Sequence, residues 1–385
     1  MALFAGKKRV VSPTGRKRRT MSAFLEETGY RFRSNSSSNV NPIKSLVGVL
    51  EAGDGLYLGY QEAFRDLTSL EEMPPLYMPS GKSFYYAFYD CEKLGELAFT
   101  NVPKPTNVAR MFGWCSSIKS IPLMDTSECT SFQMICYNCF KLESVPAYDT
   151  SKVTDFSYAF YNCSSLVSIP KLDTSKVTNF SYAFKNCYSL TKIEKLDISQ
   201  NKSFQSCFQG CSKLAYANFV GTAPIKELGG AFSGCKVLPN DCFPTLDVTN
   251  LTELWWAYAN CYLLEDVKWT GTAPTIKGVV NSAFNRCYKL KEIPEMDLSD
   301  ATLNEDYSFA YNCSSLTAIH AKNIPFSLNI GWSTKLEREA LVEIIGNLKD
   351  MTGSTTKTLT LGSTLKAKLT ADDIKVATDK NWTVA

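Results

Sequence analysis

The sequence predicts an α/β repeat fold: a solenoid of about eleven coils of 24–26 residues, with a basic N-terminal arm before it and a small α+β cap after it. Three observations predict this fold. Cysteines recur at a fixed period, apolar residues recur at fixed offsets from each cysteine, and the composition changes at both ends of the repeated region. We assign the arm and a linker to residues 1–45, the solenoid to 46–325 and the C-terminal capping segment to 326–385.

Ten of the fourteen cysteines mark the period. The first six intervals between them are 24 residues long, the last three are 26 residues long, and Leu67 takes the cysteine's position one period before the first. A period held over this length indicates stacked repeats, so we expect a ladder of small buried thiols inside the fold. The ladder cysteines are Cys91, Cys115, Cys139, Cys163, Cys187, Cys211, Cys235, Cys261, Cys287 and Cys313.

The repeat from Cys163 to Cys187 shows the elements that we expect in each coil. Its first half, CSSLVSIPKL, predicts a short strand that ends near the proline. Its second half, SKVTNFSYAFKNC, places apolar residues at i, i+3, i+6, i+7 and i+10, which predicts a turn or two of α- or 3₁₀-helix. Between the halves, Asp173 or Ser175 can cap the first free amides. Phe160 and Phe184, three residues before a ladder cysteine, belong to a second expected ladder of buried phenyl rings.

The C-terminal segment has a different pattern. It predicts helices at 335–349 and 370–379 and strands at 357–361 and 382–385. The first helix has an apolar face, and the last coil of a solenoid needs a cap with a polar outer surface. We therefore expect a cap, with a separate binding role as the alternative.

The recurring pattern AFxxCxxLxxIPxLDTSxVTxF resembles the BspA-type leucine-rich repeat, in a short variant that carries Asp-Thr-Ser. The best copies are residues 111–127, 159–187 and 283–299, and the resemblance covers about 280 of the 385 residues. It implies a leucine-rich-repeat solenoid and a surface protein. The copies depart from the pattern where GTAP replaces Asp-Thr-Ser at 221–224 and 271–274. Residues 336–385 resemble a segment found after such repeats in phage and prophage proteins of gut bacteria.

Other uses of the cysteines and aspartates are weaker explanations. Disulfide scaffolds belong to small secreted chains, and zinc is disfavoured because the one CxxC pair, Cys136 and Cys139, has no histidine nearby. A column of aspartates follows the ladder cysteines at one turn position. Capping of their own turns is the preferred explanation and calcium binding is the alternative. The column comprises Asp125, Asp149, Asp173, Asp197 and Asp297.

The sequence predicts a protein that is not an enzyme. His320 is the only histidine, which removes most nucleophile–histidine schemes, and its position in LTAIHAKNI suggests a structural role. No phosphate-binding glycine motif is present, and thiols buried in an apolar ladder are inert. We expect no cofactor and no metal site.

Tyrosine is abundant at positions outside the expected core. Tyrosine combines rigid apolar area with a hydroxyl group, which favours interfaces and sugar stacking. These residues predict either packing at the rim of neighbouring coils or a recognition strip. The candidate strip comprises Tyr86, Tyr158, Tyr182 and Trp256, two residues before the phenylalanine position, and Tyr188, Tyr262 and Tyr288, directly after a ladder cysteine.

The charge of the chain is uneven. Residues 1–33 carry a net charge of +7, and the rest of the chain carries −4. We interpret the basic arm as an anchor to other proteins of an assembly, with a plain tail and nucleic-acid binding through phosphate contacts as alternatives. The anchor residues are Lys7, Lys8, Arg9, Arg16, Lys17, Arg18 and Arg19.

These observations predict a phage virion protein that is made in the cytoplasm of a host bacterium, anchored by its arm, and that displays its repeats for binding a host-surface protein, a glycan or other virion proteins. The alternative is a BspA-type adhesin on a bacterial cell surface. An adhesin needs an export signal, and the first twenty residues have no apolar stretch of that kind. No apolar run is long enough for membrane insertion.

Overall fold

The structure is a computed structural model. It describes residues 64–66, 68, 70–71, 76–77, 82–100 and 104–385. The anchor residues of the basic arm and Leu67 lie outside the described residues, so their predicted roles stay predictions.

The chain divides into two compact units, which we describe separately. Unit 1 comprises the described residues of Met1–Val177 together with Asn186–Ile193, and unit 2 comprises Thr178–Lys185 and Glu194–Ala385.

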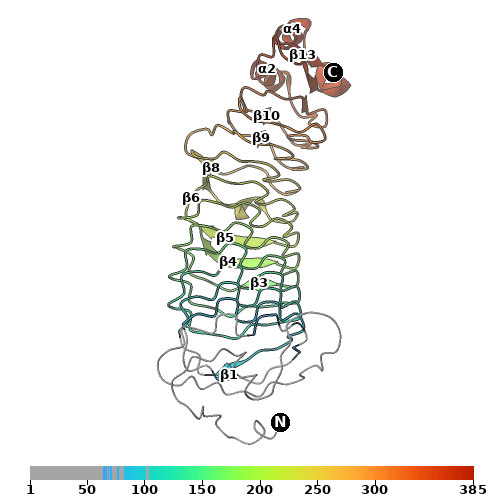
Figure 1. Ribbon diagram of the computed structural model, residues 1–385. Coiled ribbons are helices and arrows are strands. Elements are labelled where there is room, and N and C mark those ends of the chain that lie inside the picture. Colours follow the sequence, from blue (N-terminus) through green and yellow to red (C-terminus); the bar gives the residue numbers. More distant parts are fainter. Residues whose placement is uncertain (1–63, 67, 69, 72–75, 78–81, 101–103) are drawn as a thin grey trace, which may run out of the picture. The chain divides into compact units, whose positions relative to one another are not determined.

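Parallel pairing between residues one repeat apart builds unit 1 (Figure 1). β1 (Leu76–Tyr77) pairs in parallel with β2 (Phe99–Thr100), and β3 (Ser168–Ile169) pairs in parallel with the first residues of β4 (Lys192–Asp197). An isolated parallel bridge joins Ser120 to Ser144. Short parallel strands and little helix fit the predicted repeat fold.

Unit 2 has the same kind of pairing. β6, β7 and β8 form a parallel sheet in that order, and β9 pairs in parallel with β10. β5 neighbours β4 in their sheet. The elements are β5 (Tyr216–Val220), β6 (Ala223–Pro224), the 3₁₀-helix η1 (Asn240–Cys242), β7 (Leu246–Asp247), β8 (Trp269–Thr270), β9 (Glu292–Ile293) and β10 (Ala318–Ile319).

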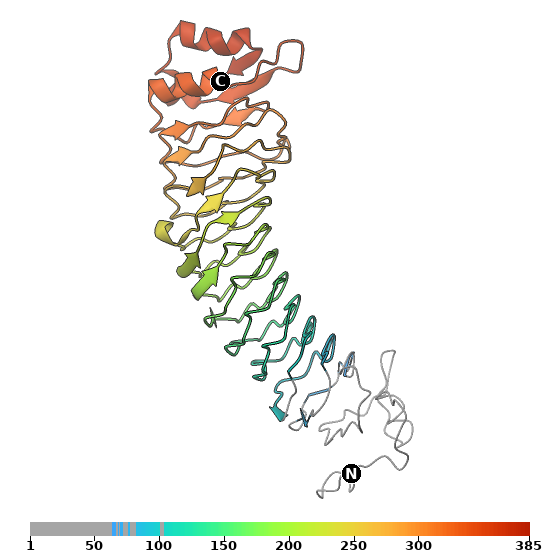
Figure 2. The same cartoon turned by 90° about the vertical axis from the view of Figure 1, so that its left-hand side faces the viewer.

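The C-terminal part of unit 2 contains the α-helices of the described chain (Figure 2). The four predicted elements are confirmed as α2 (Arg338–Gly346), β12 (Lys357–Thr360), α4 (Ala371–Asp379) and β13 (Trp382–Val384). The short helix α3 (Gly362–Lys366) was not predicted, and β11 (Leu328–Asn329) joins β12 and β13 in a parallel sheet.

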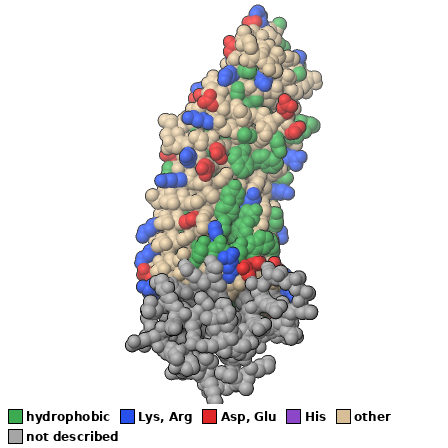
Figure 3. Space-filling model, in the orientation of Figure 1, with side chains coloured by type: hydrophobic (Ala, Val, Ile, Leu, Met, Phe, Trp, Pro, Cys, Tyr) green, Lys and Arg blue, Asp and Glu red, His purple; other side chains and the backbone are tan. Residues whose placement is uncertain are grey.

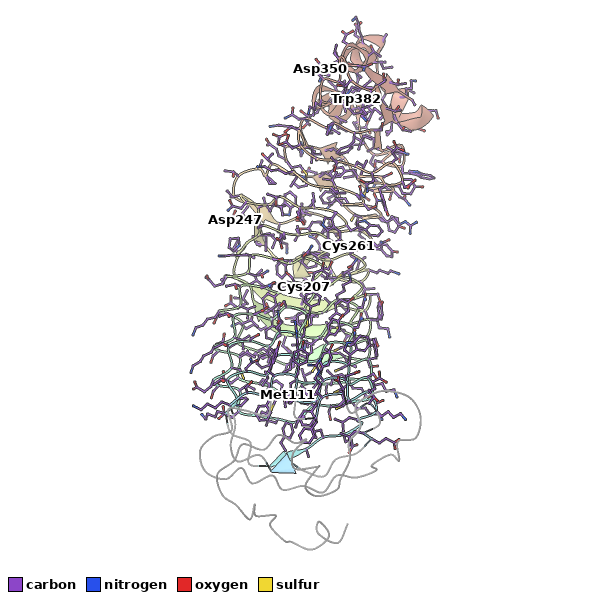
Figure 4. The ribbon with its side chains drawn as sticks, in the orientation of Figure 1. Met111, Cys207, Asp247, Cys261, Asp350 and Trp382 are labelled. Atoms are coloured by element: carbon purple, nitrogen blue, oxygen red, sulfur yellow. The ribbon has the colours of Figure 1, made fainter. Side chains whose placement is uncertain are left out.

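Side chains fix these C-terminal elements to one another. The Arg338 guanidinium on α2 binds the Asp373 carboxylate on α4, with distances of 3.0 and 2.8 Å. Trp382 of β13 is buried, and its indole N–H donates to the carbonyl of Lys349 at 2.9 Å (Figure 4).

The second half of the repeats is not helical, and this prediction was wrong. The N–H groups of Ala87 and Cys91 donate to carbonyls three residues earlier, as in a 3₁₀-helix, but the segment forms consecutive turns. Tyr86 and Asp90 have φ angles of 57° and 63°, so left-handed residues interrupt the right-handed winding twice. Positive φ recurs five residues before nine of the ten ladder cysteines and one residue before all ten.

The ladder cysteines lie inside their units. All ten have exposed fractions of 0%, and none of the fourteen cysteines, which all belong to the described chain, forms a disulfide. Each ladder thiol donates a hydrogen bond to a backbone carbonyl of the preceding repeat. Examples are Cys139 to Phe112 at 3.0 Å in unit 1 and Cys287 to Tyr258 at 3.0 Å in unit 2.

Aromatic rings form a column beside the thiols in each unit. In unit 1, Phe64 stacks on Phe88 with centroids 5.0 Å apart. In unit 2, Phe208 stacks on Phe232 at 5.6 Å. Phe309, which belongs to a repeat with a reversed Phe-Ala order, instead meets Phe284 edge-on at 89°. The reversed order therefore changes the ring packing and keeps the ring buried.

The turn residues also join successive repeats. In unit 1, the Thr126 and Thr150 hydroxyls donate to the carbonyls of Asp149 and Asp173, at 2.7 and 2.6 Å. The amide of Asn162 donates to Asn138 Oδ1 at 2.7 Å and accepts from Asn186 at 2.8 Å, which makes an asparagine ladder.

The GTAP segments of unit 2 need their glycines. Gly221 and Gly271 have φ angles of 84° and 87°, and a Cβ atom on either would collide with a turn of the preceding repeat. The obstructing side chains are Ser199 for Gly221, and Asp247 with Thr249 for Gly271.

The buried thiols predict a loss of stability at alkaline pH. Burial raises the pKa of Cys163 well above the ordinary value of 9.0 and raises the pKa of Cys313 to about 12. Because the unfolded chain ionises its thiols at lower pH than the folded chain, this contribution is fully present below about pH 9 and is lost as the pH rises toward about 12. The midpoint of thermal unfolding, followed by circular dichroism, should fall over this range.

The matched variant is Cys163→Ala/Cys187→Ala, which lacks two of the thiols. Its midpoint should fall less steeply with pH than that of the unsubstituted chain. Equal slopes would show that lysine and tyrosine titration, and not the thiols, cause the loss.

Candidate binding surface

Half-buried aromatic side chains gather on the turn half of the repeats in unit 1. Trp114 and Phe140 are the most exposed of them, at 37% and 38%. We call this set the aromatic face of unit 1, and Figure 3 shows hydrophobic side chains, tyrosines included, gathered on the face of the molecule that it draws. The aromatic face comprises Tyr85, Tyr86, Tyr89, Trp114, Tyr137, Phe140, Tyr158 and Tyr161.

Ring contacts connect these residues across repeats. Tyr86 meets Tyr89 nearly edge-on, with centroids 4.8 Å apart. Trp114 meets Tyr137 at 6.1 Å. Tyr137 stacks on Tyr161 at 4.9 Å and 14°, and Tyr158 lies 5.7 Å from Tyr161. The rings therefore form two groups within unit 1, one around Tyr86 and one around Tyr137.

Two arginines lie on the ring of Tyr86. The guanidinium carbons of Arg65 and Arg110 are 4.7 and 5.2 Å from its centroid, within cation–π range. Arg110 Nη1 also donates to the Tyr86 hydroxyl. Arg110 Nε is buried and has no hydrogen-bond partner, and within the described chain no ion pair joins Arg110 to an acidic residue. Its positive charge is thus only partly compensated.

The acidic residues near this end of the aromatic face interact with Arg65. Arg65 Nε lies 3.5 Å from Asp66 Oδ1. Burial, together with the charges of Glu92 and Asp66, raises the pKa of Asp90, and Arg65 opposes this shift. Burial also raises the pKa of Tyr89, so the phenol stays neutral.

The backbone at two of the predicted residues is strained. Tyr86 and Tyr158 have φ angles of 57° and 56°, in a region that costs roughly 1–2 kcal/mol for a residue with a Cβ. The other left-handed column, one residue before the cysteines, is rich in residues that tolerate this conformation, such as Asn138 and Asn162. In unit 1 the column of Tyr86 and Tyr158 holds bulky side chains instead, with Arg110 and Met134 as its other members. This indicates that the side chain, and not the backbone, decides the residue there.

Unit 2 contains four of the predicted strip residues. Tyr182 and Trp256 each belong to a group of their own, and Tyr262 and Tyr288 share a third. Tyr182 has a φ angle of 60°, and the Lys185 ammonium lies 5.3 Å from its ring centroid. Trp256 has a φ angle of 54° and meets Tyr307 edge-on at 5.9 Å. Tyr262 and Tyr288 lie 4.9 Å apart, with Lys236 at 6.0 Å from the ring of Tyr262.

The structure thus places the predicted residues in several groups. Tyr86 and Tyr158 belong to the aromatic face of unit 1. Tyr188, also in unit 1, is 49% exposed and shares no ring contact with that face among the described residues. Sequence reasoning missed Arg110, although it occupies the same position in its repeat as Tyr86 does in the repeat before. Reading every residue of that column, and not only its aromatic ones, would have found it.

The described residues offer no cluster of metal ligands. Within them, no group of three or more His, Cys, Asp or Glu side chains could hold a metal ion. Asp125 caps its own turn, since its Oδ1 accepts from the Ser127 amide at 3.1 Å and from the Ser127 hydroxyl at 2.6 Å. Hydrogen bonds from Ser127 lower the pKa of Asp125 to about 2. Capping of the turn accounts for the position of this carboxylate, so no calcium ion is needed to explain it.

The single histidine lies between two carboxylates. His320 Nδ1 is 2.8 Å from Glu343 Oε1 on α2, and Nε2 is 3.8 Å from Glu292 Oε2 on β9. This arrangement links α2 to the last strands of the repeats and supports the structural interpretation. The helices of the described chain include none with the length and apolar character of a membrane span.

Two family descriptions match parts of the chain. Residues 224–330 match "BspA type Leucine rich repeat region (6 copies)", and residues 106–222 match "Mycoplasma protein of unknown function, DUF285". The first match supports a BspA-like leucine-rich-repeat protein. No curated protein matches the chain.

Solved structures of bacterial leucine-rich-repeat proteins are similar to this chain at low identity. A Treponema pallidum protein has 21% identity and a TM-score of 0.31, with 51% of this chain and 79% of that chain covered. A Bacteroides ovatus protein has 17% identity and a TM-score of 0.39, with 91% of this chain and 94% of that chain covered. A leucine-rich cell surface protein from Faecalibacterium prausnitzii has 16% identity and a TM-score of 0.29, with 72% of this chain and 89% of that chain covered.

Substitutions at Tyr158 test the backbone argument. Asn tolerates positive φ and Ala does not, so Tyr158→Asn should be more stable than Tyr158→Ala by about 1 kcal/mol, although both remove the same ring. Thermal unfolding midpoints of the two variants give the comparison.

Tyr161 supplies the matched control, because it contacts the same rings and has no positive φ. At this position, Tyr161→Asn should be no more stable than Tyr161→Ala. The same Asn advantage at both positions would mean that it does not come from the left-handed backbone.

Proposed function

We propose that this chain is a non-enzymatic binding protein and that the aromatic face of unit 1 is its recognition surface. The observation that supports it best is the strained backbone of Tyr86 and Tyr158 beneath half-buried rings. Strained residues that persist in a fold tend to cluster at functional sites. The column also includes Gly230 in unit 2, where the ring of Trp255 packs against the glycine.

The predicted solenoid of about eleven coils and the cap at 326–385 stay predictions that fit this role. Stacked repeats hold side chains at fixed spacing, so a surface made from them is ordered before a partner arrives. The match to a BspA-type repeat region supports a surface or binding protein in the same general sense.

We propose that the chain acts in a phage virion, where residues 1–33 attach it to other virion proteins and the repeats bind a host-surface protein or glycan. The net charge of +7 on residues 1–33 and the resemblance of residues 336–385 to phage proteins support this role. A BspA-type adhesin on a bacterial cell surface is the second candidate, and the repeat-family match favours it equally. Both candidates use the same recognition surface.

Binding through the aromatic face can be tested without a known partner. The full chain is probed against three immobilised collections: a random peptide-display library, a glycan array and single-stranded DNA oligonucleotides. We expect at least one class of ligand to bind, and the substitution of Tyr86, Tyr158 and Tyr161 by Asn to weaken that binding at least tenfold.

The control is Leu123→Asn/Tyr216→Asn, which changes two exposed side chains outside the aromatic face, at 67% and 43% exposure. This variant should bind like the unsubstituted chain. If the control and the triple variant lose binding equally, or if no ligand depends on the three tyrosines, the aromatic face is not the recognition surface.

Deletion of residues 1–33 separates the two candidate settings. In a virion protein the deletion should abolish co-purification with assembled particles and leave ligand binding by the aromatic face unchanged. Labelling of intact bacterial cells with antibody to the chain, with no particle association, would favour the adhesin.

A further inference from the structure

We infer that the partner of the aromatic face is a protein that presents an Asp or Glu side chain beside apolar side chains, and that Arg110 receives the carboxylate. This inference rests on the proposed function. It follows from how the rings face one another and from the unmet charge of Arg110.

The rings of the aromatic face use their faces on one another. Tyr137 and Tyr161 are stacked, and the ring of Tyr86 lies under two guanidinium groups. These contacts occupy at least one face of each of the three rings, so less open face remains for a ligand to stack on. A sugar ring or a nucleic-acid base binds tyrosine by stacking on an open face. Edges and hydroxyls instead suit the mixed apolar and hydrogen-bonding contacts of a protein interface.

Arg110 gives the surface its charge preference. Its guanidinium is held by the ring and hydroxyl of Tyr86, and its Nε is buried without a hydrogen-bond partner. A cation that has lost part of its hydration gains more from a carboxylate than a solvated one does, since its field is less screened. The nearby acid Asp66 already lies close to Arg65. The missing carboxylate can come from a partner.

Unit 2 shows the same combination on its own. Lys185 lies over the ring of Tyr182, and burial lowers the pKa of its ammonium group. Tyr182 occupies the same column of its repeat as Tyr86. A cation on a tyrosine of this column therefore recurs. Arginine and tyrosine together are also the residues that dominate binding energy at protein interfaces.

The test uses the full chain and a random peptide-display library. Selected peptides should be enriched in Asp or Glu next to aromatic or aliphatic residues. A synthesised peptide from the enriched set should bind Arg110→Asn at least tenfold more weakly than the unsubstituted chain. Asn suits the φ of 59° at this position, so this substitution removes the guanidinium without adding backbone strain.

Lys119→Asn is the matched control, because it removes one exposed positive charge from unit 1 at a position on the strand half of the repeat. It should bind the peptide like the unsubstituted chain, and Arg110→Lys should recover part of the affinity that Arg110→Asn loses. Equal losses in Arg110→Asn and Lys119→Asn would reduce the effect to net charge and overturn the role of Arg110.

The outcomes for the partner class are also distinct. If tyrosine-dependent binding is found only for glycans or for single-stranded DNA, the proposed function stands and the inference of an acidic protein partner fails. If no ligand in any collection depends on the three tyrosines, the proposed function fails and this inference fails with it.

Discussion

The hydrogen bond from each ladder thiol to a backbone carbonyl of the preceding repeat is the interaction on which the rest of the structure depends. The turn half of a repeat winds through two left-handed residues, yet its carbonyls still accept backbone N–H groups, as Phe112 does from Cys115 at 3.0 Å. The thiol of the next repeat adds a second donor to such a carbonyl and so joins the two repeats, with donor–acceptor distances from 2.9 to 3.4 Å along the two ladders. A cysteine fits because it is small, apolar and still a donor. An alanine would remove this donor and leave the carbonyl with its backbone hydrogen bond alone.

This constraint explains why the two halves of a repeat behave differently. The half that follows the cysteine pairs with its neighbours through ordinary parallel bridges, such as that between Ser120 and Ser144. The half that precedes the cysteine is also joined by backbone hydrogen bonds, such as Phe88 N–H to the Met111 carbonyl, and it adds thiols, phenyl rings and the asparagine ladder. Because these inward side chains fill the interior, the outward positions of the same half are not needed to fill the core. Bulky residues such as Tyr158 can occupy them if the backbone strain is tolerated.

The sequence predicted the features that repeat at fixed offsets and missed those that depend on backbone conformation. The cysteine period, the ring column and the helices at 338–346 and 371–379 were readable because each depends on residue type and spacing. The predicted helical turns before the cysteines failed because apolar spacing does not report the sign of φ. Asn138, Asn162 and Asn186, each directly before a cysteine, were a usable signal for the left-handed backbone. The residue type of Arg110 gave no signal for positive φ, and its only signal was its place in the same column as Tyr86.

The change from 24-residue to 26-residue repeats has a consequence for how this chain tolerates insertions. Where the period lengthens, the thiol bonds a carbonyl 29 residues back instead of 27, yet Cys261 and Cys211 keep the same donor–acceptor distance of 3.1 Å. In the last repeat Asp297 still stands ten residues after Cys287, so the two added residues lie between Asp297 and Cys313, in the turn half. The same repeat lacks positive φ five residues before its cysteine, yet the Cys313 thiol keeps its hydrogen bond to the Phe284 carbonyl at 2.9 Å. A gene encoding such repeats can therefore gain codons without losing the thiol contact, even where the outward column of that repeat changes its conformation.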